Sequence, residues 1–176
     1  LDLYTHGGVF LNLLAPILLM IWVSRVASPW AGCFSLAAYL FMGNHDYPSW
    51  KFATYSPWLW PFNFTQGLAL ATLLTLQVGV ERNKTRPFVW GGLLLGLTFL
   101  SHTAPAAIIA LTLIAVCGIQ LLTRRWTLPN AATRLCSAGM MSMLVAAVLM
   151  WPLWQAYHLT MLNAAPANFT GLFKNE

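Results

Sequence analysis

Charged side chains are scarce in this sequence. Asp, Glu, Lys and Arg make up only 7% of its 176 residues, whereas hydrophobic residues make up 59%. A soluble domain typically carries about 25% charged residues, which cover its surface. The shortage argues against a water-soluble protein and predicts an integral membrane protein. One membrane-spanning helix needs roughly 20 apolar residues, so the chain has room for about six spans and for no separate soluble domain.

The chain also has few cysteines and lacks several enzyme motifs. Cys33, Cys117 and Cys136 fall in apolar stretches, so we expect small buried hydrophobic residues rather than a disulfide framework or a zinc site. There is no glycine-rich phosphate loop with a Lys and no pair of histidines at metalloprotease spacing. The intramembrane carboxylates of many ion-coupled transporters are missing too. These absences argue against ATP hydrolysis, metalloprotease chemistry and ion-coupled transport.

What the sequence does have is a series of apolar segments, at residues 9–26, 27–43, 64–80, 88–100, 104–122 and 135–153. Each is predicted to be a helix, because an isolated strand cannot satisfy its backbone groups in lipid. We therefore expect an all-α fold, a polytopic membrane helix bundle of about six transmembrane helices that forms one domain over residues 1–176. The first residue is not Met and the end is polar, so we expect a fragment of a longer protein.

The basic residues orient this bundle, because short cytoplasmic loops are enriched in Lys and Arg. With six crossings and the N-terminus outside, Lys51 and Lys174 are the basic residues left outside. The cytoplasmic side receives Arg25, Arg82, Lys84, Arg86, Arg124, Arg125 and Arg134. The net charge of +5 thus indicates orientation in a membrane, predicted to be the plasma (inner) membrane, and not nucleic-acid binding.

The fourth crossing, at residues 88–100, is short for a membrane span. One alternative is a single helix over residues 88–122 with a kink at Pro105. That helix would place its two flanking basic clusters on opposite sides of the membrane. The charge bias therefore favours a hairpin that turns at SHTAP, with His102 near the outer boundary. Gly92 and Gly96, one helical turn apart, predict close packing of this segment on a neighbour, and Ala138, Ser142 and Ala146 repeat the same small-residue spacing.

The longest stretch between apolar segments, GNHDYPSWKFATYSPWLWPFNF at residues 43–64, falls outside in this orientation. Trp58 and Trp60 carry amphipathic rings of the kind that membrane interfaces favour. One interpretation of the loop is therefore an interfacial belt.

The other interpretation is a catalytic site around Asp46. A carboxylate near a low-dielectric boundary can act as a general base or hold a cation. In this interpretation His45 would share the proton of Asp46, and Lys51 would favour the charged carboxylate. His102 is a second candidate, because the helix break beside it frees backbone groups for binding; the alternative is a structural histidine that caps the break.

The segment WGGLLLGLTFLSHTAPAAIIALTL, with the preceding FNFTQGLALATLLTLQVGVERNKTRP, resembles a region of GT-C type polytopic glycosyltransferases and their bacterial relatives. The likeness covers roughly residues 30–125. It implies a GT-C-like fold and transfer of a sugar from a polyprenyl-phosphate donor on the extracytoplasmic face. The family's D-x-D or E-x-D motif is absent and would lie before Leu1 in a fragment.

The resemblance also implies roles for the loop residues. Asp46, with His45, would be the base or a ligand of a divalent metal. Lys51 or His102 would bind the departing phosphate, and Trp58 and Trp60 would stack on the sugar or pack on the lipid. Two other functions remain open. One is a non-catalytic membrane subunit whose partners are lipids and other membrane helices, and the other is a fragment of a transporter or channel.

Overall fold

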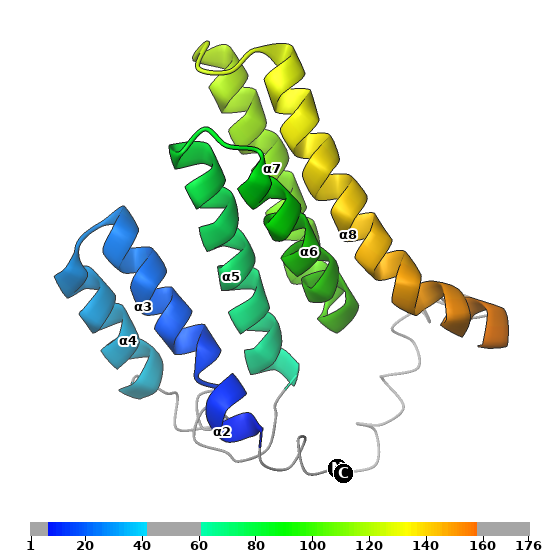
Figure 1. Cartoon of the computed structure of the whole chain (residues 1–176). Helices are drawn as coiled ribbons and strands as arrows, with labels where there is room; N and C mark the ends of the chain where they lie inside the picture. The colour runs from blue at the N-terminus through cyan, green and yellow to red at the C-terminus, as the bar shows by residue number, and fades with distance from the viewer. Residues whose placement is uncertain (1–6, 42–60, 158–176) are drawn as a thin grey trace, which may run out of the picture. The chain divides into compact units, whose positions relative to one another are not determined.

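The computed structural model describes residues 7–41 and 61–157, and this part of the chain contains helices and no strand (Figure 1). The predicted all-α fold is confirmed. The helices in chain order are α2 (Gly8–Leu11), α3 (Leu14–Val26), α4 (Pro29–Phe41), α5 (Pro61–Glu81), α6 (Arg86–Ser101), α7 (Thr103–Leu122) and α8 (Leu128–Tyr157).

Prolines mark where most of these helices begin. A proline is tolerated in the first turn of a helix, where its missing N–H has no partner to lose. Pro29 and Pro61 are the first residues of α4 and α5, and Pro87 and Pro129 are the second residues of α6 and α8. Pro16 lies in the first turn of α3, and its ring would clash with the carbonyl group four residues earlier in a continuous helix. This clash explains why α2 and α3 are separate.

Two of the described helices are long and apolar enough to cross a membrane: α7, and α8 over Leu128–Ala156. α3 and α4 have 13 residues each. At 1.5 Å per residue each reaches only about 20 Å, against a hydrocarbon core of about 30 Å. α5 has 21 residues, but its Thr and Gln side chains make it less apolar. Membrane association is thus supported by two helices, and the six-span bundle stays a prediction.

The chain divides into two compact units, Leu1–Ala146 and Ala147–Glu176. The first contains α2 to α7 and the start of α8, and the described part of the second is the remainder of α8. The expectation of one domain over the whole sequence stays a prediction.

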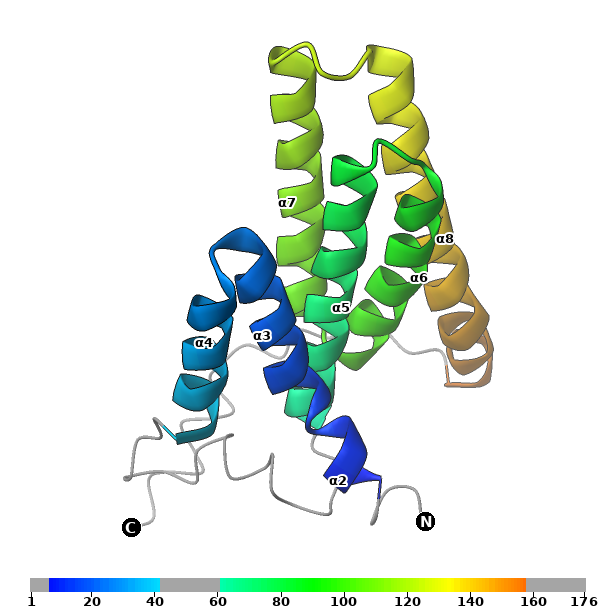
Figure 2. The same cartoon turned by 60° about the vertical axis from the view of Figure 1, so that its left-hand side comes forward.

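Within the first unit, α3 to α7 and the start of α8 alternate in direction along the chain (Figures 1 and 2). α3 contacts α4 and α5, and α6 contacts α5 and α7. The turns after α3, α5 and α7 lie at one end, the upper end in both views. We call it the arginine end, because all seven basic residues predicted to be cytoplasmic lie in or beside these turns. The α6–α7 turn lies at the opposite end, the histidine end, with the end of α4 and the start of α5.

The predicted close approach at Gly92 and Gly96 is confirmed. A Cβ atom on Gly92 would lie 2.8 Å from Cα of Ala138, and one on Gly96 would lie 2.8 Å from the carbonyl oxygen of Ser142. Both neighbours belong to α8. Small residues on both helices therefore let the α6 and α8 backbones touch.

Polar side chains are also buried between helices of the first unit. Thr72 of α5 and Thr98 of α6 are fully buried, with their hydroxyl oxygens 3.4 Å apart. Each hydroxyl lies 2.8 Å from the carbonyl oxygen four residues earlier, to which it donates. These two buried hydroxyls therefore find their acceptors within their own helices.

The cysteines behave only partly as predicted. Cys117 is buried in the core, as expected. Cys33 and Cys136 are exposed, so the prediction of burial is wrong for them. They lie on outward faces of α4 and α8, where an apolar side chain meets the surroundings instead of another helix.

Candidate functional site

Most of the predicted site lies outside the described residues. Asp46, His45, Lys51, Trp58 and Trp60 all fall between α4 and α5, in the range 42–60. The flanks of this range are described: α4 ends at Phe41 and α5 begins at Pro61, both at the histidine end (Figures 1 and 2). The described helices on either side of this segment therefore end and begin at the end that carries His102.

His102 separates α6 from α7 and caps both. Its backbone is extended, with φ −163° and ψ 123°. Its N–H donates to the carbonyl oxygen of Thr98 at 2.8 Å, and its Nδ1 accepts from the N–H of Ala104 at 3.3 Å. The predicted hairpin break is confirmed and a continuous helix kinked at Pro105 is wrong, since Pro105 occupies the first turn of α7. Of the two roles considered for His102, the structure shows contacts for the helix cap.

The cap also determines what the exposed imidazole can offer. Because Nδ1 accepts a hydrogen bond, the neutral ring carries its proton on Nε2. The exposed imidazole in this tautomer has a donor at Nε2.

At the arginine end, a hydrogen-bonded chain joins α3 to α5. Nη2 of Arg25 lies 2.5 Å from Oε2 of Glu81 in an ion pair, and Nε2 of Gln77 donates to Oε1 of Glu81 at 2.7 Å. Glu81 follows the predicted span 64–80 directly. The hydrogen bond from Gln77, with the Arg25 guanidinium, lowers the pKa of the Glu81 carboxyl below its ordinary value of 4.5. The carboxylate is thus held charged at neutral pH.

Arg134 is the buried cation of this end, with 4% of its surface exposed. Its Nη2 donates to Asn83 twice, to the backbone oxygen at 3.1 Å and to Oδ1 at 2.7 Å. Its Cζ lies 3.9 Å from the ring centroid of Trp126 and 5.8 Å from that of Phe88. Its Nε and Nη1 are buried, and no group among the described residues accepts from them. Arg134 thus ties α8 to the α5–α6 turn and to the α7–α8 turn.

The sequence analysis missed this role, because it treated Arg134 only as one of seven basic residues that orient the chain in the membrane. The available signals were two. Arg134 is followed directly by an apolar run, and position 83 is Asn, a residue type that tolerates the left-handed conformation found there (φ 53°) better than most.

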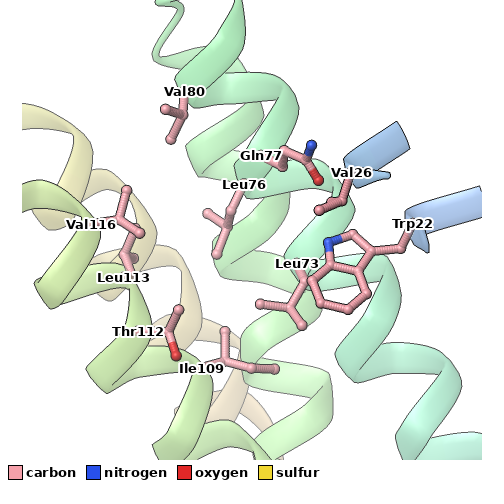
Figure 3. Close-up of a pocket in the computed structure, with 10 residues that line it drawn as sticks. All are labelled: Trp22, Val26, Leu73, Leu76, Gln77, Val80, Ile109, Thr112, Leu113 and Val116. Atoms are coloured by element: carbon pink, nitrogen blue, oxygen red, sulfur yellow. The ribbon is translucent and has the colours of Figure 1, made fainter. Parts of the chain in front are cut away.

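An apolar hollow lies between α3, α5 and α7 (Figure 3). We call it the α3–α5–α7 groove, and its volume is about 290 Å³. Its lining is aliphatic except for Trp22, Gln77 and Thr112. The Thr112 hydroxyl donates to the carbonyl oxygen of Ile108 at 2.8 Å, and Oε1 of Gln77 is buried without a partner in the described part of the chain. The groove is suited to an apolar chain.

In the second unit, Ala147, Met150, Trp151 and Trp154 of α8 line a shallow apolar surface. The rings of Trp151 and Trp154 are 5.5 Å apart between centroids. Paired Trp side chains near the end of an apolar helix are typical of a membrane interface.

No group of three or more His, Cys, Asp or Glu with metal-site geometry occurs among residues 7–41 and 61–157. In comparisons with known proteins, no family model, no curated protein and no solved structure matches this chain.

Proposed function

We propose that this chain is a multi-pass membrane protein whose six helices α3 to α8 cross the bilayer, with the arginine end in the cytoplasm and the histidine end outside. The observation that carries the proposal is the alternation of helix directions in the first unit, which gathers seven basic residues at one end. Cytoplasmic loops are enriched in Lys and Arg, so this gathering has the sign expected of a membrane protein.

The short helices fit this proposal with modest adjustments. α2 and α3 together cover residues 8–26, which is about 28 Å of helix at 1.5 Å per residue. Where a helix is shorter than the hydrocarbon core, local thinning of the bilayer accommodates it at a small cost per ångström. Trp30 on α4 is 76% exposed, as expected of an interfacial anchor near the end of a span.

Single-cysteine labelling tests the topology. In a background with the three native cysteines changed to Ala, Lys84→Cys and Lys51→Cys are each exposed to a membrane-impermeant maleimide in intact cells and in inverted vesicles. We expect Lys51→Cys to react in cells and Lys84→Cys in inverted vesicles. Reaction of both from the same side contradicts the proposal.

For the chemistry, we propose transfer of a sugar from a polyprenyl-phosphate donor at the histidine end. The resemblance to GT-C glycosyltransferases supports it, as does the position of the end of α4 and the start of α5 at the end that carries His102. Asp46 accepts the proton of the acceptor hydroxyl as that oxygen attacks the anomeric carbon, and the lipid phosphate leaves with the bonding electrons. His102 donates to that phosphate through Nε2–H, and a divalent metal is the cofactor that the resemblance implies.

Sugar transfer by membranes that contain the full chain tests this chemistry. Asp46→Asn should lower the rate by about 10² to 10⁴, the usual contribution of a general base. Asp46→Glu is the matched control and should keep part of the activity. Undiminished transfer by Asp46→Asn, at equal amounts of protein in the membrane, removes Asp46 from the reaction.

A second candidate, the non-catalytic membrane subunit, is favoured by the outward faces of α7 and α8. Ile108, Leu111 and Ile114 of α7 are 53% to 67% exposed, and Met140 and Met143 of α8 are more than 70% exposed. Such faces pack either on lipid or on another membrane helix. A photoreactive residue at Ile114 distinguishes the two: crosslinks to one discrete polypeptide support the subunit, and crosslinks to lipid alone count against it.

A further inference from the structure

The α3–α5–α7 groove has a form that a single apolar chain can fill. Figure 3 shows Leu73 and Leu76 of α5 between Trp22 and Val26 on α3 and the aliphatic residues of α7. A volume of about 290 Å³ is at the small end for ligand sites, which run from about 300 to 1,000 Å³. Thr112 lines the groove and is itself exposed, so the groove is open to the surroundings.

The groove offers its occupant few hydrogen bonds along the wall. Nε2 of Gln77 already donates to Glu81, and the Thr112 hydroxyl donates within its own helix. An apolar chain that enters the groove is therefore stabilised because its surface leaves water, or leaves lipid that packs against it less closely. Any polar head that the chain carries must be held elsewhere.

That polar head meets cations where the groove ends. Val26 and Val80 line the groove and are sequence neighbours of Arg25 and Glu81, which form the ion pair. Arg82 follows directly. The arginine end as a whole holds seven basic side chains against one carboxylate, a net formal charge of +6. An anionic head is therefore complementary to this end of the groove.

From this combination we propose that the α3–α5–α7 groove binds one acyl chain of an anionic phospholipid, whose phosphate is held at the arginine end by Arg25 and Arg82. The inference goes beyond sugar transfer and rests only on the membrane placement proposed above. The occupant is a bulk lipid of the leaflet that faces the arginine end, distinct from the polyprenyl-phosphate donor at the histidine end.

The full chain, purified in mild detergent with phosphatidylglycerol or phosphatidylcholine of identical acyl chains, tests the proposal by native mass spectrometry. We expect one retained lipid with a preference for phosphatidylglycerol. Arg82→Gln should reduce that preference about fivefold, the contribution of one cation near a membrane surface. Glu81→Gln should raise it, because Arg25 is then no longer neutralised.

Thr112→Trp fills the groove and should abolish retention of either lipid, whereas Ile108→Trp, on the exposed face of α7 outside the groove, should leave it unchanged. Val116→Phe repeats the filling test if Thr112→Trp does not fold. Retention by a folded, groove-filled variant equal to that of the original chain overturns the proposal. Equal retention of the two lipids by the original chain overturns it as well. So does a groove-filled variant that loses a co-purifying polypeptide and not a lipid. Failure of the cysteine-labelling test would show separately that the membrane placement is wrong.

Discussion

α6 and α7 are neighbours in one hairpin and are similarly apolar, yet they are buried in different ways. α6 buries six of its 16 residues, and three of these are glycines. α7 buries a narrow stripe of four residues, Ala106, Ile109, Leu113 and Cys117, and exposes large aliphatic side chains elsewhere. α6 therefore packs closely against α5, α7 and α8 through small residues, whereas α7 packs along one narrow face only. The difference shows that an apolar sequence reports a helix but not which of its faces touches protein.

The contact that anchors the start of α6 should be the most sensitive to change. Arg134→Ala removes two hydrogen bonds to Asn83 and the stacking on Trp126. Charged hydrogen bonds and desolvated cation–π contacts contribute up to about 2 kcal/mol each. Removal of the buried, unpartnered Nε and Nη1 offsets part of this, so we expect a net loss of about 2 to 4 kcal/mol. Unfolding by SDS in mixed micelles measures it. Arg125→Ala, at an exposed position, is the control and should change stability by less than about 0.5 kcal/mol.

A Gly→Ala substitution should change the stability of the protein in opposite directions in α6 and in α7. Gly92→Ala places a Cβ against the Ala138 backbone, and overpacking of this kind costs about 1 to 3 kcal/mol. Gly118→Ala on α7 meets nothing within 4 Å and should stabilise the helix by about 0.5 to 1 kcal/mol. The same SDS titration compares the two variants. Equal effects would mean that α6 does not approach α8 closely.

The turn between the two helices should respond more weakly. His102→Ala removes the side-chain cap on Ala104 and should cost about 0.5 to 2 kcal/mol, while His102→Asn keeps a capping oxygen and should recover most of it. The comparison also separates structure from chemistry. If His102→Asn is as stable as the original chain but loses sugar transfer, the imidazole has a role beyond the cap.

The smallest effect should be a pH dependence at the arginine end. The pKa of Glu81 is lowered from 4.5 in the folded chain, so its ion pair contributes fully above about pH 4.5 and the contribution disappears as pH falls through the lowered folded pKa. A slight loss of stability in this acidic range should be present in the original chain and absent in Glu81→Gln. Because both side chains are more than 40% exposed, solvent weakens the effect. An identical pH profile for the two chains would show that the ion pair contributes nothing.

Several elements of the fold were predictable from hydropathy and proline positions. The predicted segment 104–122 differs from α7 by one residue at its start, because His102 and Pro105 mark that boundary. The segment 135–153 begins seven residues after the start of α8, because residues 128–134 include polar side chains and Arg134 and do not register as apolar. Hydropathy alone does not show that a guanidinium can be covered by Trp126 and Asn83.

The candidate site could be predicted from the sequence less well than the helices. Asp46 and Lys51 lie outside the described residues, so their roles stay predictions. For His102, the neighbouring Pro indicated a helix break, but only the geometry distinguished a cap, through the 3.3 Å contact with the N–H of Ala104.

The sequence by itself determined that the chain is helical, apolar and asymmetric in charge, because backbone satisfaction, hydropathy and the spacing of Arg and Lys are local properties. Only the tertiary structure decided which residues form the contacts between helices. Arg134, Gly92 and the groove beside Gln77 owe their roles to helices that are distant in sequence, and such contacts arise when the helices pack together.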